Sequence, residues 1–147
     1  MIYPTSYVKM RFKMAKTLRK QCLDEIQKLA RISAADEYGL VNCVSCGKRL
    51  HWKDADGGHY IAKGSSSYWS LVIENVHPQC KGCNCFGMKH GSAEGEYTLW
   101  MIDMYGHDFV QQMHNDKRKI RKLYTADYRK MLYEFKDLVK FHEGRLL

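Results

Sequence analysis

Long apolar runs and prolines are both scarce in this sequence. None of its apolar runs reaches the roughly 18 residues that a membrane-spanning helix needs, so we expect no membrane partner. Nothing after Met1 is typical of the hydrophobic region of a signal peptide, and a cytoplasmic location is expected. With only two prolines in 147 residues, the chain can form long helices.

Acidic residues are also in the minority. Sixteen Asp and Glu face 24 Lys and Arg, which gives a formal net charge of +8 and a pI of about 9.2. Such an excess of positive charge on a small protein predicts a polyanionic partner, and nucleic acid is the commonest one.

Four of the six cysteines form two Cys-x-x-Cys pairs, at Cys43, Cys46, Cys80 and Cys83. Six cysteines in a secreted protein could form three disulfides. Two pairs at this spacing instead favour zinc, which binds four thiolates at about 2.3 Å in a tetrahedron. We therefore predict a structural zinc ion. Cys22 lies in an apolar helical register and is interpreted as a core residue, and Cys85 as packing.

Apolar periodicity predicts one α+β domain over residues 1–147 that is mostly helical. It divides into a basic N-terminal helix (1–38), a zinc-knuckle core (40–91) and C-terminal helices (92–147). A loose start is expected at residues 1–5. The core is predicted as strands at 48–52, 59–61 and 68–73, a turn at 54–58 and a helix at 80–88. Three further helices are predicted: 93–105 after a Ser92 cap, one within 107–123, and one starting at a Thr125 cap.

Basic residues gather in two stretches of the sequence. A charge run is often only a solvated surface, but both stretches are also suited to phosphate contacts. The candidate DNA-binding residues are Lys9, Arg11, Lys13, Lys16, Arg19 and Lys20 in the first helix, and Lys117, Arg118, Lys119, Arg121 and Lys122 before the last one.

The segment between and around the cysteine pairs resembles a known nuclease motif. Gly58-His59-Tyr60-Ile61, followed by Asn75-x-His77-x-Gln79-Cys80-x-x-Cys83-Asn84, is similar to the zinc-knuckle branch of the HNH (ββα-metal) endonucleases. More closely, it resembles the lambdoid phage NinG/Rap recombination nucleases over most of residues 15–140. The resemblance implies a central zinc-stapled ββα module, a catalytic Mg²⁺ or Mn²⁺, and cleavage of branched DNA such as Holliday junctions and D-loops.

The resemblance also implies residue roles. His59 is the candidate general base, Asn75 the residue that braces the ββα turn and orients the histidine, and Asn84 a helix-borne cation ligand. The four paired cysteines are implied as the structural zinc ligands.

One position departs from the pattern of the family. Most HNH enzymes carry Asp or His directly before the base, whereas this chain has Gly58. Asp56 is the expected replacement ligand, with Asp54 behind it. In an alternative register His59 is the ligand and Tyr60 the base. His77 and His90 are further candidate ligands of the catalytic cation, because imidazole suits such sites.

The leading hypothesis is a metal-dependent DNA endonuclease that acts on branched DNA, as a homodimer because opposed nicks need two active sites. One alternative is a non-catalytic zinc module that binds nucleic acid, for which the missing ligand at position 58 is the support. Another is a sequence-specific homing or restriction-type nuclease, against which the sequence shows no separate recognition domain. For the site itself, the alternative to catalysis is that His59 serves only in packing.

Overall fold

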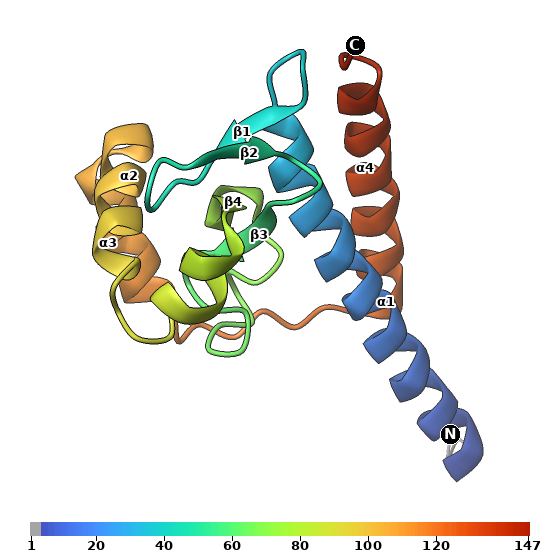
Figure 1. Cartoon of the computed structure of the whole chain (residues 1–147). Coiled ribbons are helices and arrows are strands. Elements are labelled where there is room, and N and C mark those ends of the chain that lie inside the picture. Colours follow the sequence, from blue (N-terminus) through green and yellow to red (C-terminus); the bar gives the residue numbers. More distant parts are fainter. Residues whose placement is uncertain (1–3) are drawn as a thin grey trace.

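The computed structural model describes residues 4–147 and shows an α+β protein (Figure 1). Two helices lie side by side on one flank, two more on the other, and two small sheets lie between the pairs. The long elements are α1 (Thr5–Ser33), α2 (Glu94–Tyr105), α3 (His107–Asp116) and α4 (Thr125–Glu143). The strands are β1 (Leu40–Asn42), β2 (Arg49–His51), β3 (Asp56–His59) and β4 (Val76–Gln79), with short helical segments η1 (Ile73–Asn75) and η2 (Gly82–Gly87). No helix in this part of the chain is long and apolar enough to cross a membrane.

Helices α1 and α4 enclose one hydrophobic core. The buried face of α1 carries Cys22, Ile26 and Leu29, and α4 contributes Leu132 and Phe135. Cys22 is fully buried, which confirms its prediction as a core residue. Because α4 starts beside the middle of α1, the first half of α1 extends past it (Figure 1).

Helix α1 confirms the prediction of a long N-terminal helix, although it begins at Thr5. The expected loose start is therefore wrong at Thr5, and residues 1–3 of that prediction lie outside the described residues. Pro4 is well placed before the helix because its ring fixes a backbone angle close to that of the first turn.

The two sheets are antiparallel pairs, β1 with β2 and β3 with β4. In the second pair Gly58 lies opposite His77, and His59 opposite Val76. With the helical segment after β4, the order of strand, loop, strand and helix is the one that the sequence predicts. The two strands, however, lie at other residues than predicted. Asp54 does end a turn, but the turn predicted over 54–58 is wrong from Asp56 onwards, where β3 begins. Residues 68–71 form turns and Ile73 begins η1, so the strand predicted at 68–73 is wrong and the second strand is β4.

The paired glycines of β3 explain the error. Neither has a positive φ, so they do not make a turn. They allow close packing instead: a Cβ on Gly57 would lie 2.6 Å from the Cα of Gln27 in α1, and one on Gly58 would lie 1.8 Å from Oε1 of Gln79. Gly-Gly here marks a strand pressed between a helix and a neighbouring side chain.

Two predictions in the C-terminal half are corrected and one is confirmed. Ser92 does not cap α2, since its hydroxyl donates to the carbonyl of Gly87 and the helix begins at Glu94. The helix predicted within 107–123 is confirmed as α3, which ends at Asp116, so the basic run 117–122 follows it. We call residues 117–124 the basic linker. Thr125 is the first residue of α4 rather than its cap, and the carboxylate of Asp127 accepts from the backbone N–H of Tyr124.

Candidate functional site

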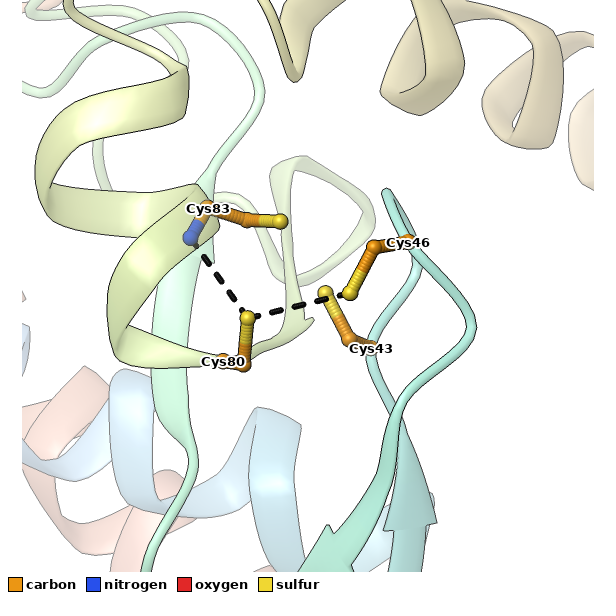
Figure 2. Close-up of side chains that lie close together, drawn as sticks. All are labelled: Cys43, Cys46, Cys80 and Cys83. Atoms are coloured by element: carbon orange, nitrogen blue, oxygen red, sulfur yellow. Dashed lines mark hydrogen bonds between the residues drawn. The ribbon is translucent and has the colours of Figure 1, made fainter.

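The four paired cysteines converge on one point (Figure 2). Cys43 and Cys46 lie in the turn after β1, and Cys80 and Cys83 at the start of the helical segment after β4. All four sulfur atoms lie within 4.8 Å of one another. The Sγ atoms of Cys46 and Cys80 are 3.8 Å apart, which is about the edge of a tetrahedron with zinc–sulfur bonds of 2.3 Å. The donor set and its geometry therefore fit a zinc ion.

Local backbone structure shapes both halves of this cluster. Gly47 closes the first turn with φ +73°, a conformation that favours glycine, and its N–H donates to the carbonyl of Cys43. In the second half the N–H of Cys83 points at the sulfur of Cys80 (Figure 2). The N–H of Val44 donates to the carbonyl of Pro78. A metal at the cluster would fasten the β1–β2 pair to the start of the helix that carries Asn84.

A separate pocket brings together three of the residues singled out in the sequence. Asp56 at the start of β3, His59 at its end and Asn84 on η2 line one cavity of about 410 Å³. Oδ2 of Asp56 accepts a hydrogen bond of 3.0 Å from Nδ2 of Asn84. Lys63 also lines the pocket. Carboxylate and amide oxygens are donors that Mg²⁺ and Mn²⁺ prefer, so Asp56 and Asn84 could hold a divalent cation if the Asn84 amide turned its oxygen, rather than its nitrogen, towards Asp56.

The ring of His59 is oriented by a backbone carbonyl. Its Nε2 lies 2.9 Å from the oxygen of Ser70. Because a carbonyl can only accept, Nε2 carries the proton and Nδ1 is left as an acceptor. Burial lowers the pKa of His59, the hydrogen bond to the Ser70 carbonyl partly opposes this, and the positive charges of Lys63 and Arg19 lower the pKa further. His59 is therefore neutral at pH 7, the state that a general base requires.

Asn75 lies next to this pocket without lining it. Its side chain is completely buried and makes three hydrogen bonds. Oδ1 accepts from the N–H of Ile61 at 2.7 Å, and Nδ2 donates to the carbonyls of Ile61 and Trp69 at 2.9 and 3.1 Å. These bonds hold both ends of the loop that joins β3 to the Ser70 carbonyl, so Asn75 braces the loop that orients His59.

His77 is in the aromatic core, away from this pocket. Its Nδ1 lies 3.0 Å from the hydroxyl of Tyr97, and its Nε2 lies 2.8 Å from that of Tyr105. Both ring nitrogens therefore have partners, and burial lowers the pKa of His77 to about 4. The structure does not bring His77 together with Asp56 and Asn84.

Tyr97 extends this contact to the backbone of β3. Its hydroxyl donates to the carbonyl of Gly58 at 2.8 Å, so it must accept from Nδ1–H of His77. Nε2 of His77 then accepts from Tyr105. Sequence reasoning missed this series of hydrogen bonds, which runs from Tyr105 through His77 and Tyr97 to the backbone of β3. The sequence feature that could have indicated it is the spacing of Tyr97 and Tyr105, which are eight residues apart and therefore lie on one face of α2.

The other two candidates also lie elsewhere. His90 is exposed and lines a different cavity, with Cys46 and Cys83. Tyr60, the base in the alternative register, is buried, and its hydroxyl contacts Thr98 and Nε2 of His114 at 2.8 Å each. This arrangement points the Tyr60 hydroxyl at α2 and α3 and favours the register with His59 as the base.

The predicted DNA-contacting residues lie on the surface. All are exposed except Arg19, which is half-buried and near enough to His59 to affect its pKa. Two of them are in ion pairs, Lys20 with Asp24 and Lys119 with Asp116, at 2.7 Å each.

Fold and site together define a small α+β protein with a four-cysteine cluster that could hold a zinc ion, and with a pocket of carboxylate, amide and imidazole. The sequence profile described as Bacteriophage Lambda NinG protein matches residues 5–143, and the chain belongs to this phage family, which is related to recombination. The match confirms the NinG part of the resemblance. No curated protein and no solved structure gives a significant match.

Proposed function

We propose that this protein is an HNH-type, metal-dependent DNA endonuclease that hydrolyses phosphodiester bonds in branched DNA. One observation carries the proposal: Asp56, His59 and Asn84 line the same pocket although they come from two ends of a strand and from a helix. A general base and two cation ligands are the parts that metal-assisted hydrolysis needs.

Each residue has a task in this reaction. Asp56 and Asn84 would hold a Mg²⁺ or Mn²⁺ ion, which would stabilise charge on the phosphate and on the leaving oxygen. His59 accepts a proton from water at Nδ1, while Nε2–H keeps its bond to the Ser70 carbonyl. Asn75 and Tyr97 hold the loop and the strand on either side of His59. The zinc cluster fixes the segment on which Asn84 lies.

The surface supports a grip on the DNA backbone. Lys63 lines the pocket and the charge of Arg19 reaches it, so a phosphate beside His59 meets positive charge. The exposed basic residues of α1 and of the basic linker would extend this grip. Phosphate contacts carry no base sequence, so cleavage should follow the shape of the DNA, such as a Holliday junction or a D-loop. Symmetric nicks across a junction would require a homodimer.

The test is cleavage of four-way junctions, flaps and linear duplex with Mg²⁺ or Mn²⁺. We expect His59→Ala and Asp56→Asn to slow junction cleavage by about 100-fold or more. Asp54→Asn and His107→Ala, both at exposed positions, are the matched controls and should retain activity. Zinc content and thermal melting show whether each variant is folded.

Three outcomes would contradict the proposal in different ways. Wild-type protein that binds junctions but cuts none of the substrates in either metal is a non-catalytic zinc module. One preferred site on linear DNA indicates a sequence-specific nuclease of the homing or restriction type. Equal activity of His59→Ala and wild type removes His59 from the mechanism.

A further inference from the structure

An aromatic and basic groove lies at the far end of α1, away from the pocket of His59. It runs between the first half of α1 and the end of the basic linker, with a volume of about 300 Å³. Phe12 and Tyr124, on opposite sides, are 68% and 59% exposed. We call this cavity the α1–linker groove. Its aromatic and basic lining residues are Tyr7, Arg11, Phe12, Lys122 and Tyr124.

Cations in this groove lie against aromatic rings. The guanidinium of Arg11 is 5.9 Å from the ring centre of Tyr7, and Nζ of Lys122 is 5.5 Å from that of Tyr124. None of the described lining residues is acidic. The neighbouring carboxylate of Asp127 is engaged by the N–H of Tyr124. Flat apolar rings beside positive charge, without a competing acid, are complementary to a nucleotide, which has an aromatic base and an anionic phosphate.

We propose that the α1–linker groove binds unpaired bases of the branched DNA substrate by stacking. Bases inside a duplex already stack on their neighbours, so exposed rings reach only bases at flaps, ends and crossover points. The groove would thus distinguish a branch from continuous duplex. This inference rests on the proposed function for its substrate, although binding can be measured without cleavage.

Two connections join the groove to the pocket of His59. Along α1, Phe12 and Arg19 are seven residues apart, so they share a face about 10 Å apart along the axis. Along the basic linker, the N–H of Arg121 donates to Oγ of Ser67, and Nζ of Lys119 lies 5.8 Å from the ring centre of Tyr68. Ser67 and Tyr68 belong to the loop whose Ser70 carbonyl holds His59. An unpaired base in the groove would therefore direct the adjoining strand towards the pocket, with the cut a few nucleotides from the branch.

The experiment compares binding of a splayed-arm DNA with unpaired thymines and of a fully paired duplex of equal length, without added Mg²⁺ or Mn²⁺. Fluorescence anisotropy gives both affinities. Phe12→Ala should weaken splayed-arm binding by about five-fold or more and change duplex binding by less than about two-fold. Phe141→Ala is the matched control, since that ring is 64% exposed on α4, and it should change neither.

A second variant reports stacking directly. Phe12→Trp should keep the preference for splayed-arm DNA, and its indole emission should be quenched by that DNA more than by duplex. Equal loss on both DNAs with Phe12→Ala, or no loss on either, overturns the inference. It is also overturned if Phe12→Ala turns a dimer into a monomer in sedimentation without a selective DNA effect, because the groove then holds a second copy of the chain. Selective binding by a protein that cuts no DNA supports the groove and removes only the catalytic proposal.

Discussion

Replacing Asn75 by alanine is the sharpest test of how this site is held together. In the structure the Asn75 side chain satisfies the N–H and the carbonyl of Ile61 and the carbonyl of Trp69. Ile61 and Trp69 are themselves buried, and Asn75 is completely so. Alanine would therefore leave the N–H and the carbonyl of Ile61 without a protein partner in a place where the fold excludes solvent, while the carbonyl of Trp69 keeps the N–H of Val72.

The expected cost follows from the two backbone groups of Ile61. An unpaired buried polar group costs about 1–3 kcal/mol, so Asn75→Ala should lower the free energy of unfolding by about 4 kcal/mol. For a chain of this size, about 1 kcal/mol shifts the melting temperature by about 2–4 °C, which predicts a fall of about 8–16 °C. Junction cleavage should also slow, because the brace that fails holds the residue next to Ser70, whose carbonyl orients His59.

The assay is urea and thermal unfolding in zinc-saturated buffer, with Asn42→Ala as the control because Asn42 is exposed on β1. A loss below about 1 kcal/mol, or one equal to that of the control, would refute the reasoning. Asn75→Asp refines the test, since a carboxylate would point at two carbonyl oxygens. Burial and repulsion would raise the pKa of that carboxyl above its unfolded value. The variant should then lose stability as pH rises from 5 to 8, relative to Asn42→Asp.

Three further predictions concern packing, metal and protonation. Gly57→Ala should destabilise the fold by about 1–3 kcal/mol in urea unfolding, because the new Cβ meets the backbone of Gln27, whereas Gly64→Ala has open space and should be nearly neutral. Wild type should contain one zinc per chain by elemental analysis, and Cys80→Ser should lose both zinc and cooperative unfolding; a zinc-free folded wild type contradicts this. Because the pKa of His77 is about 4 when folded and near 6.5 when unfolded, stability is complete above pH 6.5 and falls as pH drops towards 4. Between pH 7.0 and 5.5 wild type should lose about 1 kcal/mol more than His77→Gln in zinc-saturated urea titrations.

Local signals in the sequence were sufficient for much of this fold. The apolar spacing in α1 and α4 is sustained over many turns, and the start of each helix was predicted within a few residues. The cysteine pairs needed only their own spacing to predict the cluster that forms. The short strands were harder, because three or four residues hold little periodicity, and the Gly-Gly pair of β3 is as typical of a turn as of a tightly packed strand.

Only part of the candidate pocket was predicted, because the sequence shows the type of a residue but not where its side chain points. His59, Asp56 and Asn84 were singled out from the motif, and the structure places all three around one cavity. His77 and His90 have the residue type of metal ligands, yet type alone does not say where a side chain points. The hydroxyls that bind both nitrogens of His77 lie 20 and 28 residues further along the chain, on α2. Only the packing of α2 against the β3–β4 pair brings them together.

The glycine at position 58 follows from packing and does not by itself indicate a lost active site. A side chain there would overlap Gln79, whose Nε2 donates to the hydroxyl of Ser45 beside the cysteine cluster. An acid at position 58 would thus require Gln79 to leave the contact that joins β4 to the turn of the zinc knuckle. Asp56, two residues earlier on the same strand, lies opposite Gln79 in register and still reaches Asn84. The chain therefore keeps a carboxylate at the pocket and the Gln79 contact at the knuckle together, which an Asp directly before His59 would not permit.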